Sequence, residues 1–146
     1  MASHILRISD ALALGLHAMA YLAKEPGKPK RVKEIAEILE ASEAHLSKVL
    51  QALARAGLLK ATRGPRGGYV LNKAPEDITL LEIYEIISGP LEDQRCLFRK
   101  PLCDGKSCLL GNLLQDVNRL VREKFSQTTL IEAQKLVFDK KEDKNA

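Results

Sequence analysis

Apolar residues near the N-terminus recur with the spacing of amphipathic helices. Residues 9–23 are mostly apolar, Ser9 is placed to cap the first turn, and Glu25-Pro26-Gly27 stops the pattern. In residues 32–39, apolar side chains fall at positions i, i+3, i+4 and i+7, which lie on one helix face. The sequence therefore predicts a mostly buried helix over 9–23 and a shorter amphipathic helix over 32–39.

A third helix is predicted directly afterwards. Its apolar stripe spans residues 46–54, Ser42 is placed as its N-cap, and Gly57 ends it. Only residues 40–42 separate it from the preceding helix, which is the arrangement of a helix-turn-helix. The major groove of DNA admits such a helix, so side chains near its N-terminus could reach base edges. The candidate DNA contacts here are Ser42, Glu43, Ala44, His45, Ser47 and Lys48.

Two short β-strands are predicted next, over residues 58–62 and 69–71. Between them, residues 63–68 read Arg-Gly-Pro-Arg-Gly-Gly, and glycines permit the backbone angles of a tight loop. Arg63 and Arg66 give this hairpin a basic tip that could meet a phosphate or a minor groove. A hairpin directly after a helix-turn-helix favours a winged helix-turn-helix over an ordinary solvated hairpin.

The C-terminal half predicts three more helices. Thr79-Leu80-Leu81-Glu82 has the pattern of a capping box before a fourth helix that ends at Gly89-Pro90. A long helix is expected from about residue 109, and a second capping-box pattern at residues 129–132 opens a short final helix. The apolar stripe of the long helix exceeds the needs of a small monomer, which favours a homodimer interface over packing within its own chain. Its members are Leu110, Leu113, Leu114, Val117, Leu120 and Val121.

These elements predict a mainly α fold with a small β-wing. The expected organisation is a winged helix-turn-helix DNA-binding domain over 1–90, a cysteine-bearing sensor loop over 91–108, dimerisation helices over 109–138 and a disordered tail over 139–146. With 146 residues and 45% apolar content, the chain can bury a core without disulfide bonds. No apolar stretch reaches the roughly 20 residues of a membrane span, so we expect a cytoplasmic protein without a membrane partner.

Charge separates the two halves of the chain. Residues 1–75 carry twelve lysines and arginines against six acids, whereas residues 76–146 carry eleven against thirteen. A basic half of this kind indicates a polyanionic partner such as double-stranded DNA, although a merely soluble basic face is the alternative.

Three cysteines, Cys96, Cys103 and Cys108, lie within thirteen residues. An odd number cannot pair completely, which favours metal, cluster or thiol chemistry. Converging thiolates bind iron or zinc, and three ligands leave one coordination position open for a sensing role. From the spacing alone, an iron–sulfur cluster, zinc and unligated thiols all remain possible.

Catalysis is not indicated. His4, His17 and His45 are scattered over the N-terminal region, and no nucleophile–base pair or phosphate-binding loop is evident. We therefore expect a protein that is not an enzyme, and the alternative of a small thiol or metal-transfer protein has only the cysteines in its favour.

One family shares this pattern over nearly the whole chain. The sequence resembles the IscR/NsrR family of bacterial winged helix-turn-helix repressors, and the double glycine of the wing is the most specific element. The matching residues are Ile35-Ala36, Leu46, Leu50, Leu53, Gly57-Leu58, the wing residues 63–71, residues 75–79 and Ile83. The resemblance implies a homodimer whose recognition helices and wings bind a palindromic operator.

The resemblance also implies site roles. Arg63 matches the wing arginine that enters the minor groove, and Cys96, Cys103 and Cys108 match three cysteines that hold an iron–sulfur cluster, of the 2Fe–2S or 4Fe–4S type. The middle cysteine is displaced by one residue from the family spacing, and other members of the family lack cysteines. The implied function is a DNA-binding repressor controlled by a cluster that responds to redox state, nitric oxide or iron–sulfur status. A cluster-free regulator controlled by thiol oxidation or by a partner is the alternative.

A fourth cluster ligand is not evident in the sequence. Some members of the family use a histidine where this chain has Gly111, and others use an acid where it has Ala13. His17 matches a position that serves as a ligand in one branch, although a core or interface histidine bonded to backbone is the slightly favoured interpretation. Asp10 and Asp104 are further oxygen donors.

Overall fold

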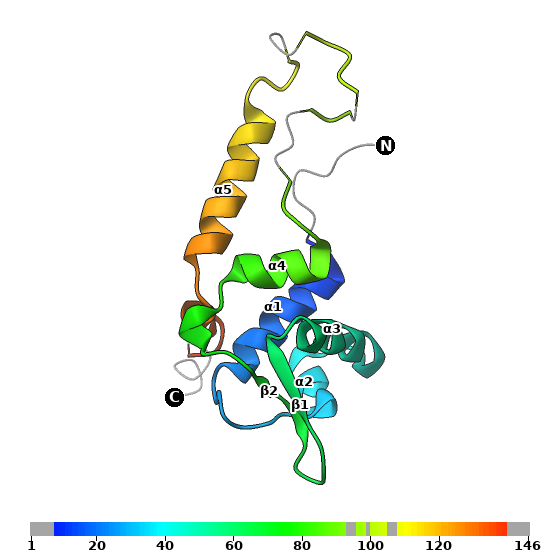
Figure 1. Ribbon diagram of the computed structural model, residues 1–146, viewed down its shortest axis with the longest axis vertical. Coiled ribbons are helices and arrows are strands. Elements are labelled where there is room, and N and C mark those ends of the chain that lie inside the picture. The colour runs from blue at the N-terminus through cyan, green and yellow to red at the C-terminus, as the bar shows by residue number, and fades with distance from the viewer. Residues whose placement is uncertain (1–7, 93–95, 99, 105–107, 140–146) are drawn as a thin grey trace.

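The computed structural model describes residues 8–92, 96–98, 100–104 and 108–139. Four helices form a compact body with a two-stranded wing at one end, and a long helix leads away from the other end (Figure 1). The elements are α1 Asp10–Leu22, α2 Val32–Leu39, α3 Glu43–Arg55, β1 Leu59–Thr62, β2 Gly68–Leu71, a 3-10 turn Pro75–Asp77, α4 Leu80–Ser88, α5 Leu113–Gln127, α6 Leu130–Gln134 and a π-helical turn Lys135–Asp139.

Side-chain caps begin four of these helices at the residues predicted from sequence. The hydroxyls of Ser9, Ser42, Thr79 and Thr129 each accept a backbone N–H from three residues further on, at 3.1, 3.4, 3.3 and 3.5 Å. Such caps satisfy N–H groups that have no partner within the helix. The α1 and α3 helices consequently lie within one residue of their predicted bounds, and α2, which has no side-chain cap, also lies at its predicted bounds.

Only one of the two predicted capping boxes is complete. At α6, the Glu132 carboxylate accepts the Thr129 N–H at 3.3 Å, which completes the reciprocal pair. At α4, Glu82 instead pairs with Lys73 at 3.2 Å. The prediction of a full box at Thr79 is therefore wrong in its second half, because a tertiary ion pair takes the Glu82 carboxylate.

The α1 helix lies at the centre of the body, in contact with α2, α3, α4 and α6. Fully buried side chains of one cluster join these elements to α1, including Met19 of α1, Leu46 and Leu50 of α3 and Ile83 of α4. Gly15 allows the close approach, since a Cβ at this position would lie 2.2 Å from Cδ1 of Ile87. The core thus holds α3 against α1 and α4, which determines the face of α3 that stays exposed.

The wing is a two-stranded antiparallel sheet in which Leu59 lies opposite Leu71 and Thr62 opposite Gly68. The strands begin one residue later in β1 and one residue earlier in β2 than predicted. Periodicity could not assign Gly68 to a strand, because its place in β2 depends on pairing with Thr62.

The α5 helix begins at Leu113, about four residues later than predicted. Gly111 adopts a left-handed conformation, with φ at +58°, and donates its N–H to the carbonyl of Cys108 at 3.0 Å. This turn stops a helix from starting at residue 109, and Leu109 is 96% exposed. The correction moves the helix start away from the last cysteine.

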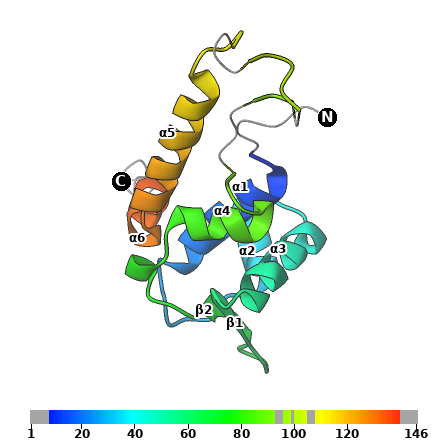
Figure 2. The ribbon, with the colours of Figure 1, turned by 45° about the horizontal axis from the view of Figure 1, so that its top comes forward.

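The apolar stripe of α5 divides between two environments. Leu114 and Val121 are 2% and 8% exposed, so they are buried in their own chain, and Val117 packs against the cluster that contains Val121. Leu113 and Leu120 are 49% and 66% exposed. The surface available for the predicted dimer interface is therefore narrower than the predicted stripe, because α5 uses one face to cover α1 and α4 (Figure 2).

The predicted tail and the predicted sensor loop both lie partly outside the residues that the structure describes. Residues 140–146 of the predicted disordered tail lie outside the described residues, as do 93–95, 99 and 105–107 of the predicted sensor loop. Within the described part of the chain, no helix is both long enough and apolar enough to cross a bilayer.

Candidate nucleic-acid interface

The α3 helix presents a polar face whose direction is set by its buried side. Leu46, Val49, Leu50 and Leu53 are at most 5% exposed and fix the rotation of the helix about its axis. The other face carries the predicted DNA contacts: Glu43, Ala44, His45 and Lys48 are exposed and Ser47 is half-buried. The structure therefore places five of the six predicted residues within the first half of one exposed helix face, where a groove could admit them.

Ser42, the sixth predicted contact, already has a structural role. Its Oγ accepts the N–H of His45 at 3.4 Å as the N-cap of α3. The hydroxyl hydrogen can still be donated to an external acceptor such as a phosphate oxygen. A single side chain can thus cap the helix and contact DNA.

Gln51 is a polar residue of this face that the sequence analysis did not select. Its Nε2 donates to the Ser47 Oγ at 3.1 Å, and the side chain is exposed. The i, i+4 spacing from Ser47 puts both residues on the same helix face, so the spacing was the available signal. The hydrogen bond orients two groups that are each able to pair with a base edge.

The tip of the wing is a short turn that exposes Arg63 and Arg66. The Gly67 N–H donates to the Gly64 carbonyl at 2.9 Å, which closes the turn. A Cβ on Gly67 would lie 2.4 Å from the Thr62 carbonyl oxygen, so no larger residue fits there without a shift. The predicted arginines therefore project from a loop whose shape depends on glycine.

Near the loop end of the wing, β2 is joined to the segment between α1 and α2. The backbone N–H and C=O of Lys30 pair with the C=O and N–H of Tyr69 at 2.9 and 2.8 Å. A Cβ on Gly68 would lie 2.4 Å from the Lys30 carbonyl oxygen, which explains why the second residue of the Gly67-Gly68 pair is a glycine. The wing is consequently fixed against the helical body as well as within its own hairpin.

An ion network surrounds the side chain of Lys30. Its Nζ lies 3.2 Å from Glu25 and 3.4 Å from Glu34, and 5.5 Å from the centre of the Tyr21 ring. Burial alone would lower the pKa of Lys30, but the hydrogen bond to Glu25 and the surrounding charges raise it above its ordinary value. Hydrogen bonds from Lys28 and Lys30 lower the pKa of Glu25. Both shifts favour the charged forms of Lys30 and Glu25.

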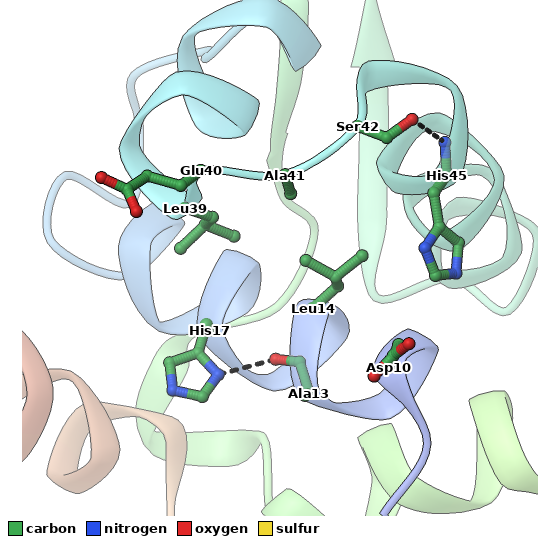
Figure 3. Close-up of a pocket in the computed structure, with 9 residues that line it drawn as sticks. All are labelled: Asp10, Ala13, Leu14, His17, Leu39, Glu40, Ala41, Ser42 and His45. Atoms are coloured by element: carbon green, nitrogen blue, oxygen red, sulfur yellow. Dashed lines mark hydrogen bonds between the residues drawn. The ribbon is translucent and has the colours of Figure 1, made fainter.

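A pocket of about 480 Å³ adjoins the helix-turn-helix (Figure 3). The α1 helix, the turn and the start of α3 form its walls, with Asp10, Ala13, Leu14, His17, Leu39, Glu40, Ala41, Ser42 and His45 as lining residues. Glu40 has a positive φ of 52° at the end of α2, which lets the chain turn sharply into α3. The polar groups of this pocket are exposed, and two of them, Ser42 and His45, belong to the candidate DNA face.

His17 lies in this pocket, which no cysteine lines. Its Nδ1 donates to the Ala13 carbonyl at 2.6 Å, one turn earlier in α1, so Nε2 is the ring nitrogen left for a metal (Figure 3). The structure therefore does not bring His17 together with the cysteines inside this pocket, and its role as a ligand stays a prediction.

The three cysteines are free thiols on the segment between α4 and α5. Cys96 and Cys108 are half-buried and Cys103 is exposed. The Sγ of Cys96 accepts the Phe98 N–H and the Sγ of Cys108 accepts the Leu110 N–H, both at 3.4 Å. Backbone N–H groups directed at sulfur are a usual feature of cysteines that hold an iron–sulfur cluster. Among the described residues, however, no three potential ligands are assembled around one point.

Comparison with known proteins decides the class. The pattern of the Rrf2 family, described as iron-dependent transcriptional regulator, matches residues 8–135. The chain belongs to the Rrf2 family. It is 39% identical over 87 residues to CymR, an HTH-type transcriptional regulator of Bacillus subtilis, covering 59% of this chain and 63% of CymR.

Solved Rrf2-family structures share the fold. CymR, the global cysteine regulator of B. subtilis, superimposes with a TM-score of 0.78 at 31% identity, covering 90% of this chain and 98% of CymR. IscR of T. potens superimposes with a TM-score of 0.73 at 28% identity, covering 92% and 90%. The predicted resemblance to IscR-like repressors and the winged helix-turn-helix fold are thereby confirmed. This Rrf2-family chain is a DNA-binding transcriptional regulator and not an enzyme.

Proposed function

We propose that this Rrf2-family regulator is a homodimeric repressor that places α3 in the major groove and its wing in the adjacent minor groove of a palindromic operator. The observation that carries this proposal is the pairing of an exposed polar face on α3 with an arginine-bearing wing whose strand β1 contacts α3. Phosphate contacts by arginine and lysine position a protein on DNA, and side chains on the groove-bound helix read bases. Its site of action would be the cytoplasm.

Dimerisation would use the part of α5 that remains exposed. Leu113 and Leu120 are separated by seven residues, so they share one face of the helix, and large exposed leucines on one face favour a protein partner. A two-fold dimer presents two recognition helices to two half-sites, which matches the symmetry of a palindrome. A second copy of this chain is therefore the proposed partner of that face.

The sensor would be an iron–sulfur cluster held by Cys96, Cys103 and Cys108. When bound, such a cluster supplies a centre whose state changes with redox conditions, nitric oxide or iron supply. Support comes from the soft thiolate set, from the N–H groups directed at the Cys96 and Cys108 sulfurs, and from the family's description as iron-dependent. The type of cluster, 2Fe–2S or 4Fe–4S, is open, and His17 is one candidate for the fourth ligand.

The chain also suggests how the cysteine segment could influence DNA binding. Cys108 lies five residues before the start of α5, and the Arg122 guanidinium of α5 donates to the Leu91 carbonyl at the opposite end of that segment. Any rearrangement of the cysteines would therefore act on α5 from two points. Because α5 is the proposed dimer helix, such a movement would change the separation or tilt of the two recognition helices.

A cluster-free regulator, controlled by thiol oxidation or by a partner, is the second candidate. The exposed Cys103 thiol and the similarity to CymR, the global cysteine regulator of B. subtilis, favour it. In this case the cysteines would form disulfides or mixed disulfides on oxidation, with loss of two electrons to an oxidant such as peroxide. A thiol or metal-transfer protein has no support beyond the cysteines themselves.

Anaerobic purification followed by iron and acid-labile sulfide assays separates these candidates. The cluster hypothesis predicts iron, sulfide and visible absorption in the wild-type protein, and loss of all three in Cys96→Ala, Cys103→Ala and Cys108→Ala. Unchanged metal content in these variants, or a metal-free wild-type protein under reducing conditions, contradicts it. DNA selection from a random-sequence pool, with and without oxygen, then tests whether the state of the cysteines changes affinity.

A further inference from the structure

We propose that Lys30 is a positioning residue for DNA binding: its buried ammonium group holds the segment that anchors β2 and so fixes the direction in which the wing presents Arg63. The inference rests on the proposed role of the wing in the minor groove.

Burial marks Lys30 as unusual. It is 8% exposed, and among the described residues it is the only buried one that carries a charge. Lysine is almost never buried unless it is paired, because an unpaired ammonium in a low-dielectric site is costly. Here two carboxylates and the face of the Tyr21 ring surround it. The cost of burying the Lys30 ammonium group is therefore offset by two ion pairs and a cation–π contact.

The partners come from opposite ends of the connection between α1 and α2. Glu25 follows the end of α1, whereas Glu34 lies in the first turn of α2 and also accepts the Tyr21 hydroxyl at 2.9 Å. The Lys30 side chain, two positions before α2, consequently ties the first part of the connection to the first turn of α2. This restricts the segment to one path past the wing.

The backbone of the same residue carries the wing. Lys30 pairs with Tyr69 through two hydrogen bonds, and Gly68 provides the close approach that those bonds require. Because Tyr69 is the second residue of β2, this anchor lies just beyond the C-terminal end of the loop, and Arg63 is the first residue of that loop. A rotation of the anchor would be transmitted to the tip, so the ion network sets where the Arg63 guanidinium can reach.

A second contact links the network to the C-terminal segment. The Tyr21 ring lies 5.7 Å from the Phe138 ring, in the π-helical turn that follows α6. The Lys30 network therefore joins α1, α2, the wing and the C-terminal turn. A purely apolar side chain could fill the space but could not form the ion pairs with Glu25 and Glu34 that hold this segment.

A double-mutant experiment tests the proposal. The probe is the duplex that the wild-type protein selects most strongly from a random-sequence pool, and affinity is measured by fluorescence anisotropy. Lys30→Met, which removes the charge but keeps much of the volume, is compared in the wild-type, Arg63→Ala and Ser47→Ala backgrounds. Lys28→Met is the matched control, because Lys28 also bridges Glu25 at 3.1 Å but its side chain is 67% exposed.

The expected result is non-additive in one background only. Lys30→Met should weaken binding by about fivefold or more in the wild-type and Ser47→Ala backgrounds, but by less than about twofold when Arg63 is already absent. Lys30→Arg should recover most of the affinity, and Lys28→Met should leave it unchanged. Equal losses in all backgrounds, or no loss at all, would overturn the proposal.

Glu34→Gln keeps the experiment decisive if Lys30→Met does not fold. Its side chain is 44% exposed, so the substitution removes one charge from the network with little loss of packing. The same coupling with Arg63→Ala is expected, with a smaller effect, and additivity overturns the inference. If Arg63→Ala itself has no effect on affinity, the wing's proposed role fails instead, so the two failures are distinguishable.

Discussion

The Thr62 hydroxyl closes the wing by two hydrogen bonds to one residue: it accepts the N–H of Gly68 at 3.0 Å and donates to the Gly68 carbonyl at 3.1 Å. These bonds reinforce the last ladder pair before the loop, where the strands separate toward the arginines. The conformation of the tip therefore depends on a side chain in β1 as well as on glycines.

Replacing Thr62 with valine should loosen the tip. Valine has nearly the same shape but cannot form either hydrogen bond, so we expect a loss of about 1 kcal/mol in the free energy of unfolding, together with weaker DNA binding. Chemical denaturation and anisotropy with the selected duplex measure the two effects. Thr62→Ser is the control, because it keeps the hydroxyl; equal behaviour of the valine and serine variants would show that the bonds do not matter.

Replacing Gly68 of the wing with alanine should destabilise the fold, whereas replacing Gly27 should not. Gly68→Ala places a Cβ 2.4 Å from the Lys30 carbonyl oxygen, and a backbone atom cannot move aside cheaply. We expect a cost of about 1–3 kcal/mol, measured by thermal or urea unfolding. Gly27→Ala is the control: nothing lies within 4 Å of its Cβ, and a neutral or slightly stabilising effect is expected. A Gly68→Ala variant as stable as Gly27→Ala would refute the close approach.

Local patterns were sufficient to predict much of this architecture. The caps Ser9, Ser42 and Thr129 are visible in sequence because a cap acts on residues only three positions away. The buried stripe of α3 is also visible in sequence, because its apolar residues recur at the spacing of one helix face. These features made the helix-turn-helix and wing predictable, and the arginines at the tip followed from the wing.

Features that depend on distant residues were not predictable in this way. Lys30 and Tyr69 are paired although they lie 39 positions apart in the chain, and nothing in a local pattern indicates that they meet. The burial of one side of the α5 stripe likewise depends on a distant residue. Tyr84 of α4 belongs to the cluster that buries Val121, and its ring centre lies 5.6 Å from that of Phe125 of α5. Glu82 has an ion-pair partner that replaced its predicted capping bond. Tertiary contacts decided each of these cases.

Removing the Arg63 side chain should weaken binding to all DNA sequences. Loss of an arginine that meets the negative minor groove or a phosphate is expected to reduce affinity by roughly tenfold and to lower the slope of log affinity against log salt by about one. Arg119→Ala is the control, because Arg119 is exposed on α5 and pairs with Asp116 at 3.0 Å. If both variants bind and respond to salt equally, the wing does not contact DNA.

Substitutions at two leucines of α5 should affect dimerisation and folding stability separately. Leu120 is 66% exposed, so Leu120→Glu should dissociate the proposed dimer with a change of less than about 1 kcal/mol in monomer stability. Leu114 is 2% exposed, and Leu114→Ala should cost about 2–4 kcal/mol of folding free energy. Analytical ultracentrifugation and urea denaturation measure the two quantities. A Leu120→Glu protein that stays dimeric would place the interface elsewhere.

Tyr21 should lose its proton only at unusually alkaline pH. Burial, followed by its hydrogen bond to Glu34, raises the pKa of Tyr21 above the ordinary value of 10.0. A group with a raised pKa contributes stability that is complete below its unfolded pKa and is lost as the pH rises through the folded value. The pKa of Lys30 is also raised, so both groups favour the folded state below about pH 10 and release it above. Absorbance of tyrosinate, recorded against pH, should contain a late component that Tyr21→Phe removes. Unchanged late titration in Tyr21→Phe would mean that burial and the Glu34 hydrogen bond do not hold the Tyr21 phenol in its protonated form.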